Sequence, residues 1–231
     1  MTITLVTGAT RGLGRETVRR LVSAGQTVYL GARDPERGAI AATELGATFV
    51  PLDVTDDASA SAAAQFVDER EGRLDVLINN AGIRGGFVPL QTVTAADMLG
   101  VYDVNVFGLV RVTQAFVPLL NRSECPVIVN VGSGMGSIAI TTDPGRLEST
   151  LVGLPYSSSK AAVSMLTTQY AKAYPRMRVN VVDPGYTDTD FNEHRGTQTV
   201  QEGAEAIVRM ASIGIDGPSG TFTDRNGTVP W

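Results

Sequence analysis

Two patterns of apolar residues alternate along this chain: short, mostly apolar runs and longer segments with helical spacing. Short, mostly apolar runs occupy positions 3–7, 27–32, 48–52, 74–78 and 127–131. They are separated by longer segments in which apolar residues recur every three or four positions, as on one face of a helix. Strands that alternate with helices in this order predict an α/β fold with a parallel sheet and crossover helices.

The predicted helices begin at residues that can cap them. Asp34 can cap a helix over 35–45, and Thr55 can cap a polar, alanine-rich helix that runs to Glu71. Over 95–120 the apolar positions keep helical spacing, which predicts one long, buried helix.

Composition then narrows the class of partner. The chain has 231 residues, of which 43% are hydrophobic, so we expect one domain over 1–231 with a large core. The net charge of −5 without a basic run argues against nucleic acid and anionic membranes, and favours a small-molecule partner. The single cysteine, Cys125, excludes an intramolecular disulfide, and no apolar run approaches the ~20 residues of a membrane span. Because the N-terminus also lacks a leader-like pattern, we expect a cytoplasmic protein.

A glycine-rich turn, Thr7-Gly8-Ala9-Thr10-Arg11-Gly12-Leu13-Gly14, joins the first strand to the first helix. Gly8 permits a tight turn, while Gly12 and Gly14 let the backbone and the helix N-terminus approach a pyrophosphate. The expected cofactor contacts here are Gly8, Thr10, Arg11, Gly12, Leu13 and Gly14. A turn that binds nothing is the alternative, because these glycines are not spaced as in the common dinucleotide motif.

The end of the second strand bears on which cofactor is bound. It reads Gly31-Ala32-Arg33-Asp34, so no carboxylate stands at its tip to accept a hydrogen bond from a ribose 2′-OH. Arg33, together with Arg11, can hold a 2′-phosphate through charge-assisted hydrogen bonds. Asp34 is a contrary signal unless it caps the next helix. We therefore predict NADP(H), with NAD(H) as the alternative.

Polar residues at other predicted strand ends are further candidates. Asp53 can accept from an adenine amino group beside an apolar contact from Val54, or it can be a plain loop aspartate. Asn79-Asn80-Ala81-Gly82 suits a backbone held close to a ligand, and equally a tight turn. Ser133 follows the fifth strand, at the sheet edge where ligands of open parallel sheets collect. Asn105, inside the long helix, either anchors neighbouring helices or holds a water molecule.

The stretch from Tyr156 to Lys160 is the candidate for proton transfer. On a helix, a spacing of four places the phenol and the ammonium on one face. A cation held near a phenol lowers its pKa from about 10, which brings proton exchange closer to neutral pH. Taken alone, the pattern also fits a packed helix with an exposed lysine.

Taken together, these motifs resemble the short-chain dehydrogenase/reductase family over nearly the whole chain. The matching pieces are Thr7 to Gly14, Asp53-Val54, Asn79 to Gly82, Asn105, Ser133, Tyr156 to Lys160 and Pro184-Gly185. Gly31 to Asp34 and the tail from Gly217 to Phe222 resemble more narrowly the NADPH-dependent carbonyl reductases. The resemblance implies a Rossmann-type, doubly wound parallel sheet of about seven strands with helices on both faces.

The resemblance also implies roles for individual residues. Tyr156 would donate a proton to a carbonyl oxygen, and Ser133 would hydrogen-bond that oxygen. Lys160 would lower the pKa of Tyr156 and hold the nicotinamide ribose, and Asn105 would hold a water that replaces the proton. The cofactor would supply the hydride. The remaining expected cofactor contacts are Arg33, Asp53, Val54, Asn80, Ala81, Gly82, Tyr156, Lys160, Pro184, Gly185, Thr187 and Thr189, and no metal site is expected.

One segment is longer than is usual in that family. Ser133 and Tyr156 lie 23 positions apart, and the extra residues fall within 139–154. Pro144-Gly145 and Gly153 favour a looped excursion over a strand. We expect this enlarged segment to cover the mouth of the site, and its bulk to favour a monomer or homodimer over a tetramer.

A short lid is expected over 186–199. It precedes a helix that Thr199 and Glu202 can cap with a capping box. His194, the only histidine, lies in this lid and is interpreted as an exposed loop residue. Substrate choice should depend on the lid, on the enlarged segment and on 84–88.

The favoured prediction is an NADPH-dependent oxidoreductase that reduces a ketone or aldehyde, or oxidises the alcohol in reverse. The alternatives are an NAD-dependent alcohol dehydrogenase of the same fold and a dinucleotide-sensing protein without catalysis. A sugar-nucleotide epimerase fits less well, because such relatives are longer and usually space the glycines differently. Asn105, Ser133, Tyr156 and Lys160 together argue against a sensor, which needs no proton donor.

Overall fold

A computed structural model describes residues 1–86 and 88–231 of the chain. Its centre is an eight-stranded sheet with the strand order β3-β2-β1-β4-β5-β6-β7-β8. All neighbouring strands are parallel except the last pair, β7 and β8. The strands are β1 (Ile3–Thr7), β2 (Thr27–Ala32), β3 (Thr48–Pro51), β4 (Val76–Asn79), β5 (Val127–Val131), β6 (Arg178–Val182), β7 (Phe222–Asp224) and β8 (Gly227–Thr228).

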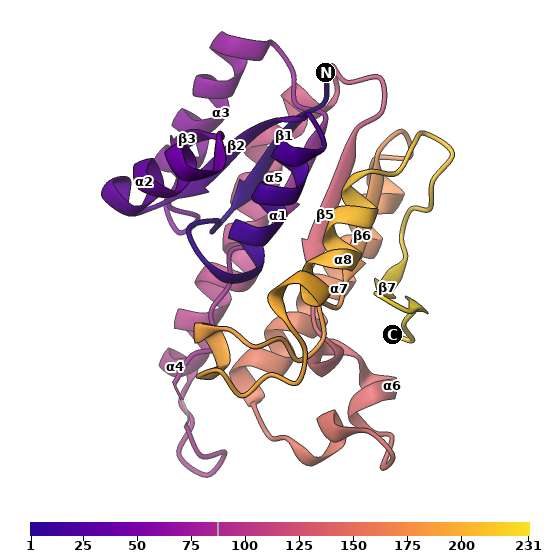
Figure 1. The fold of residues 1–231 in the computed structure, drawn as a ribbon. Helices are drawn as coiled ribbons and strands as arrows, with labels where there is room; N and C mark the ends of the chain where they lie inside the picture. The colour runs from indigo at the N-terminus through magenta and orange to yellow at the C-terminus, as the bar shows by residue number, and fades with distance from the viewer. Residues whose placement is uncertain (87) are drawn as a thin grey trace.

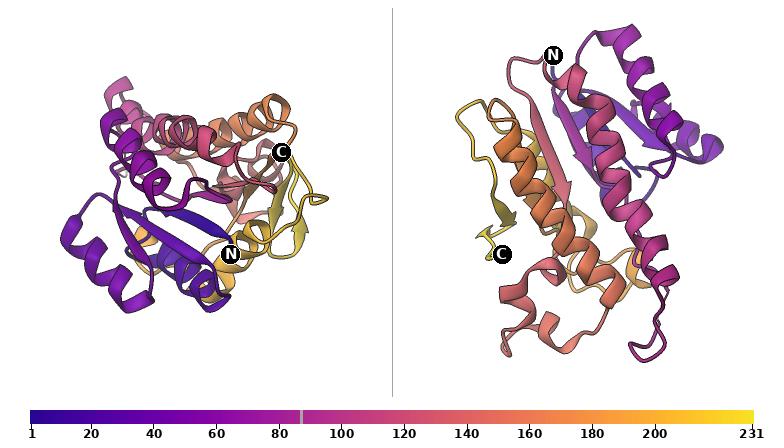
Figure 2. Two further views of the ribbon diagram at one scale, coloured as in Figure 1. Left: turned by 90° about the horizontal axis from the view of Figure 1, so that it is seen from above. Right: turned by 180° about the vertical axis from the view of Figure 1, so that it is seen from behind.

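Helices cover both faces of this sheet, which confirms the predicted doubly wound, three-layer fold (Figure 2). Helices α3, α5 and α7 bury apolar residues on one face, and α1, α2 and α8 do so on the other. The helices are α1 (Gly12–Ser23), α2 (Pro35–Leu45), α3 (Asp57–Glu71), α4 (Ala95–Tyr102), α5 (Gly108–Leu120), α6 (Ile138–Thr141), α7 (Leu154–Ala173) and α8 (Val200–Ala211). The order reverses at β1 and β4, where open α/β sheets bind ligands at the strands' carboxyl ends.

The long helix predicted over 95–120 is present as α4 and α5, joined without a break by a π-helical turn, Asp103–Phe107. Among the described residues, this is the one helix whose length and composition would also suit a membrane span. Apolar side chains of α5, such as Phe116 and Leu120, lie buried in the core, whereas Leu99 of α4 is 60% exposed. The π turn widens the helix at Asn105, and such turns often mark functional positions.

Two local predictions differ from the structure. The cap of α3 is Asp56, whose side chain accepts from two backbone N–H groups, and not Thr55. Thr55 instead donates to Asp53 through its hydroxyl at 2.7 Å and its backbone N–H at 2.9 Å. The sheet also has an eighth strand, the two-residue β8, which pairs back on β7.

Several loops gather at the end of the sheet toward which the parallel strands point (Figure 1). The enlarged segment contributes α6 and a short 3-10 turn, Leu147–Thr150, and contains no strand. The lid over 186–199 and the loop after β4 lie at the same end. Position 87, in the segment 84–88 that we expect to shape the pocket, falls outside the described residues.

Candidate active site

Helix α7 places Tyr156 and Lys160 one turn apart at the end of β5. The Lys160 ammonium lies 5.7 Å from the centroid of the Tyr156 ring, so the two side chains share a face as expected. Its Nζ donates a 2.7 Å hydrogen bond to the carbonyl of Val131, the last residue of β5. Lys160 is buried, and this bond fixes its ammonium behind the phenol.

Ser133 is held against the same helix by a tightly packed loop. Its Oγ accepts from Met135 N at 3.2 Å and begins the 3-10 turn Gly134–Gly136. A Cβ on Gly136 would lie only 2.5 Å from the Lys160 carbonyl carbon, so this loop touches the α7 backbone directly. The structure therefore brings Ser133, Tyr156 and Lys160 together, as the sequence predicted.

Burial dominates the ionisation of both groups on α7. It raises the pKa of the Tyr156 phenol to about 12, an effect to which the Asp183 carboxylate adds and which the nearby Ser133 hydroxyl opposes. It also lowers the pKa of the Lys160 ammonium to about 8. The net pKa of Tyr156 therefore lies above its ordinary value, and not below it as the sequence suggested, because desolvation disfavours the phenolate more than nearby groups favour it.

Asn105 serves as an anchor between the π turn and the loop after β4. Its Oδ1 accepts from Ile83 N at 2.8 Å, and its Nδ2 donates to the Ile83 carbonyl at 2.9 Å and to Ser159 Oγ at 3.0 Å. Beside it lies a small internal cavity with room for about one water molecule, lined also by Lys160 and Asn79. Asn79 Oδ1 has no hydrogen-bond partner among the described residues, so a water molecule bridging these groups fits the cavity.

The glycine turn is locked against the segment after β4. Thr7 Oγ1 accepts from the backbone of Asn80 and of Ala81, and Asn80 Nδ2 returns a 2.8 Å bond to the Thr7 carbonyl. A Cβ on Gly8 would lie 2.8 Å from the Ala81 Cα, and one on Gly14 would lie 2.5 Å from Asn80 Nδ2. Glycine is therefore required here by close backbone approach, a packing role that the sequence left open.

The N-terminus of α1 suits a pyrophosphate. Arg11, at its N-cap, makes no side-chain cap, and the first turn holds no acidic residue, so neither competes for the free backbone N–H groups. Gly12 has a φ of 53° and turns the chain into the helix. Thr10 and Leu13, the other expected contacts, lie half-buried in the same turn.

At the end of β2 the two arginines have different surroundings. Arg33 is exposed, and its charge helps to lower the pKa of Asp53, although hydrogen bonds from Thr55 are the larger cause. Arg11 instead pairs with Asp190 of the lid at 3.3 Å. Asp34 accepts from Arg37 N at 3.0 Å as the cap of α2, which removes the contrary signal.

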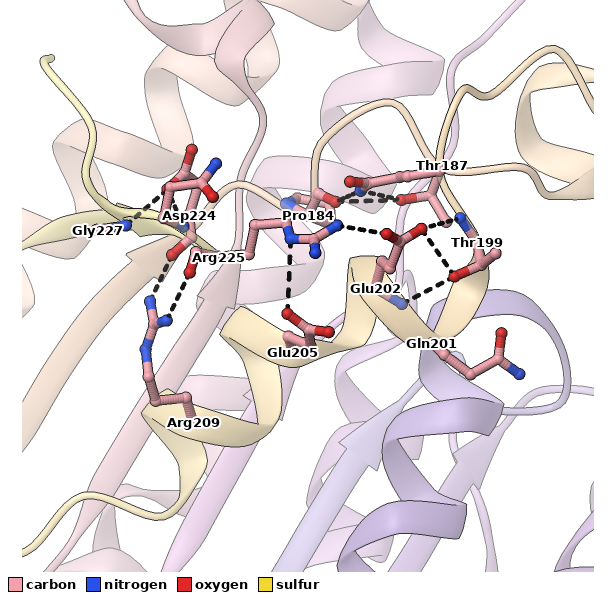
Figure 3. Close-up of polar contacts among 12 residues, drawn as sticks. Pro184, Thr187, Thr199, Gln201, Glu202, Glu205, Arg209, Asp224, Arg225 and Gly227 are labelled. Atoms are coloured by element: carbon pink, nitrogen blue, oxygen red, sulfur yellow. Dashed lines mark hydrogen bonds and ion pairs between the residues drawn. The ribbon is translucent and has the colours of Figure 1, made fainter.

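The segment after β6 returns to the glycine turn and begins the lid. Thr187 donates to the Pro184 carbonyl at 3.1 Å (Figure 3). Thr189 is buried, and its methyl would lie 3.5 Å from a Cβ on Gly12. Thr189 thus lies beside the N-terminus of α1, and Pro184, Gly185 and Thr187 precede it on the same segment, where the sequence placed cofactor contacts.

The lid itself covers Tyr156. The Phe191 ring lies 5.6 Å from the Tyr156 ring, centroid to centroid. Ion pairs from Arg11 to Asp190 and from Arg84 to Glu193 tie the lid to two neighbouring loops. His194 is exposed, as expected, and hydrogen bonds with Asp188 and Asp190 raise its pKa.

The far end of the lid is fixed by α8. Thr199 and Glu202 form the predicted capping box (Figure 3). Arg225, from the turn between β7 and β8, pairs with Glu202 at 2.8 Å and with Glu205 at 3.5 Å. In the part of the chain that the structure describes, no three His, Cys, Asp or Glu side chains gather as metal ligands.

The chain is similar in sequence to proteins of one known family. A family model described as short chain dehydrogenase matches residues 2–199. The chain belongs to the short-chain dehydrogenase family. It is 32% identical to a (+)-neomenthol dehydrogenase of Capsicum annuum, over 94% of each chain. It is 31% identical to a salutaridine reductase of Papaver bracteatum, over 97% of this chain and 94% of that protein.

A solved structure adds a close likeness in three dimensions. The NADPH-bound carbonyl reductase from chicken fatty liver aligns over 100% of both chains, with a TM-score of 0.87 and 31% identity. The predicted family is thereby confirmed. This short-chain dehydrogenase is an oxidoreductase that acts on carbonyl or alcohol substrates with a nicotinamide cofactor.

One residue of the site was not singled out from the sequence. Asp183 directly follows β6, is buried, and raises the pKa of both Tyr156 and Lys160. Asp183 could have been found from the sequence, because it is a polar residue directly after a buried strand, which is the pattern that singled out Ser133 after β5.

Proposed function

We propose that this short-chain dehydrogenase is an NADPH-dependent carbonyl reductase in which Tyr156 donates the proton. The observation that carries the proposal is the convergence of Ser133, Tyr156 and Lys160 at the carboxyl end of β5, with the buried ammonium behind the phenol. A dinucleotide sensor would have no use for this arrangement.

The residues present fit a nicotinamide dinucleotide, which supplies the hydride when it is bound. The free N–H groups of α1 and the close-packed Gly8 and Gly14 form the cradle for its pyrophosphate. Ala32 leaves the end of β2 without a carboxylate, Asp34 is occupied as a helix cap, and Arg33 is exposed beside it. These features support a cofactor with a 2′-phosphate.

Three side chains, those of Tyr156, Ser133 and Lys160, have separate roles in the transfer of the proton. With a pKa of about 12, the Tyr156 phenol carries its proton throughout the neutral range and can give it to a substrate oxygen. Ser133 Oγ lies near the phenol and would donate a hydrogen bond to that oxygen as negative charge develops. The Lys160 ammonium stabilises the phenolate left behind, and the water-sized cavity beside Asn105 offers a route for a new proton.

We extend the proposal to the class of substrate, which we expect to be a bulky, apolar ketone or aldehyde. Apolar side chains stay exposed on both segments that flank Tyr156. In the enlarged segment Leu151 is 48% and Val152 is 71% exposed, and in the lid Tyr186 is 40% and Phe191 is 39% exposed. An apolar rim around a polar centre is the usual composition of a site for a hydrophobic ligand.

The proposal also covers organisation and location. Residues 1–231 would act as one domain, since a single sheet runs through the chain from β1 to β8. We place the enzyme in the cytoplasm as a monomer or homodimer.

A panel of carbonyl compounds, followed by nicotinamide absorbance at 340 nm, tests this function. Bulky cyclic ketones should be reduced with NADPH at higher kcat/KM than small ketones of the same reactivity. Activity confined to NADH, or to alcohols that are small and polar, would contradict the proposal.

A further inference from the structure

Residues 229–231 fold back over β7, and we call them the C-terminal arm. The backbone N–H of Val229 donates to the Phe222 carbonyl of β7 at 2.8 Å, and the Val229 side chain is buried in the core. The Trp231 ring then packs on the Phe222 ring, with 5.6 Å between the centroids and a tilt of 38°. Figure 1 shows this end of the chain between β7 and α6.

The arm is hydrogen-bonded to the segment that follows Ser133. Ser137 is buried, and its hydroxyl donates a 2.7 Å hydrogen bond to the Pro230 carbonyl. Further along, the N–H of Ala139 donates to the main-chain oxygen of Trp231 at 3.1 Å. Both donors lie at the start of α6, because Ser137 is its N-cap. The arm is therefore bonded to the chain about one helical turn beyond Ser133.

The arm also reaches the chain just before Ser133, through the Phe222 ring. A Cβ on Gly132 would lie 3.7 Å from Phe222 Cε2, so this ring lies against the backbone at Gly132. Phe222 is buried, and the aromatic ring that packs on it is that of Trp231. Contacts from the arm thus reach both ends of residues 132–137, which we call the Ser133 loop.

The backbone of the Ser133 loop forms one hydrogen-bonded unit. Gly136 N donates to the Ser133 carbonyl at 2.8 Å, and Ser137 N donates to the Gly134 carbonyl at 3.0 Å. Met135 N donates to Ser133 Oγ itself at 3.2 Å. A shift at Ser137 therefore changes where the Ser133 hydroxyl lies. Misplacement of a reacting group by about 1 Å can cost about a hundredfold in rate.

We propose that the C-terminal arm is a positioning device for Ser133, a role that rests on the proposed function. The Pro230 carbonyl and the main chain of Trp231 fix the end of the Ser133 loop, and the stack of Trp231 on Phe222 fixes its start. The Ser133 hydroxyl is thereby held where a substrate oxygen develops negative charge. Loss of these contacts should lower kcat without weakening cofactor binding, because the pyrophosphate cradle lies at the N-terminus of α1.

Trp231→Ala removes the ring from Phe222 and tests this role in turnover. Its kcat for a ketone should fall roughly tenfold with a nearly unchanged Kd for NADPH, and Trp231→Phe should restore most of kcat, because it keeps an aromatic contact. In a Ser133→Ala background, which already lacks the hydroxyl, Trp231→Ala should lower kcat by less than about twofold. Ile215→Ala is the matched control, because Ile215 is 45% and Trp231 is 44% exposed, and it should leave kcat unchanged.

A second measurement needs no substrate. Amide hydrogen exchange should become faster at Gly136 and Ser137 in Trp231→Ala, because the N–H groups of both residues are bonded within the Ser133 loop. Exchange at Ala81, whose N–H donates to Thr7 Oγ1 beside the glycine turn, should stay the same. This contrast separates a local effect on the loop from a general loss of stability.

Each result decides a separate claim. A tenfold loss of kcat that repeats in the Ser133→Ala background would show that the arm acts on the whole fold, and would overturn its role in positioning Ser133. An unchanged kcat in Trp231→Ala would overturn that role as well, whatever the exchange rates are. If the wild type turns over no carbonyl at all, the proposed function fails, whereas hydrogen exchange still supports or overturns the link between the arm and the Ser133 loop.

Discussion

Replacing Arg33 by alanine should remove most of the preference for NADPH over NADH. Arg33 is exposed at the end of β2 and is free to meet a 2′-phosphate. The neighbouring carboxylate, Asp34, is held by the N-terminus of α2 and does not compete for the ribose. Arg33 is therefore the residue on which cofactor choice should depend most.

The size of the expected loss of NADPH preference depends on how exposed Arg33 is to solvent. A hydrogen bond to a charged group contributes about 1.5–3 kcal/mol, and solvent around Arg33 places this contact at the lower end. At about 1.4 kcal/mol per factor of ten, Arg33→Ala should reduce the NADPH/NADH ratio of kcat/KM roughly tenfold. Arg11→Ala should cost less, because Arg11 already pairs with Asp190 and must exchange that partner.

The assay compares kcat/KM for the two cofactors at one ketone concentration and one salt concentration. Ala32→Asp should reverse the preference, because a carboxylate there repels a 2′-phosphate and accepts from a 2′-OH. Arg20→Ala is the control, since Arg20 lies in the last turn of α1 and contacts Gln201. A wild-type preference for NADH, or an unchanged ratio in Arg33→Ala, would refute the reasoning.

Three further predictions concern the packing of Gly136, the pKa of Lys160 and the role of the enlarged segment. Gly136→Ala forces a Cβ into the α7 backbone at Lys160 and should cost about 1–3 kcal/mol of stability, seen as a lower Tm; an unchanged Tm would contradict the tight packing. Reductive kcat should fall as pH rises through about 8, where Lys160 loses its proton, and a limb near pH 10 instead would show that burial does not lower this pKa. Deleting 143–153 should broaden the range of ketones accepted, and an unaltered substrate profile would reject a gating role for the enlarged segment.

Much of the fold could be predicted because the strand ends carry strong local signals. The boundaries of β1 and β2 match the predicted runs, since a glycine turn follows one and the cap Asp34 closely follows the other. The cap of α3 could not be predicted in the same way. Thr55 and Asp56 are adjacent and both suit a cap, and only the hydrogen bonds from Thr55 to Asp53 decide between them.

The grouping of the candidate site could be predicted, but its electrostatics could not. Parallel strands bring Ser133 and the N-terminal part of α7 to one edge whatever the loops between them do. The pKa values depend instead on how deeply Tyr156 and Lys160 are buried, which no local spacing records.

The central claim is that Tyr156 donates the proton in a carbonyl reduction. Tyr156→Phe removes one hydroxyl and little volume, so the measurement pairs its turnover of a good ketone with its affinity for NADPH, read by fluorescence titration. We expect a loss of turnover of about a hundredfold or more with a nearly unchanged Kd for NADPH. Turnover close to that of the wild type, with the ketone reduced at the same rate, would contradict it.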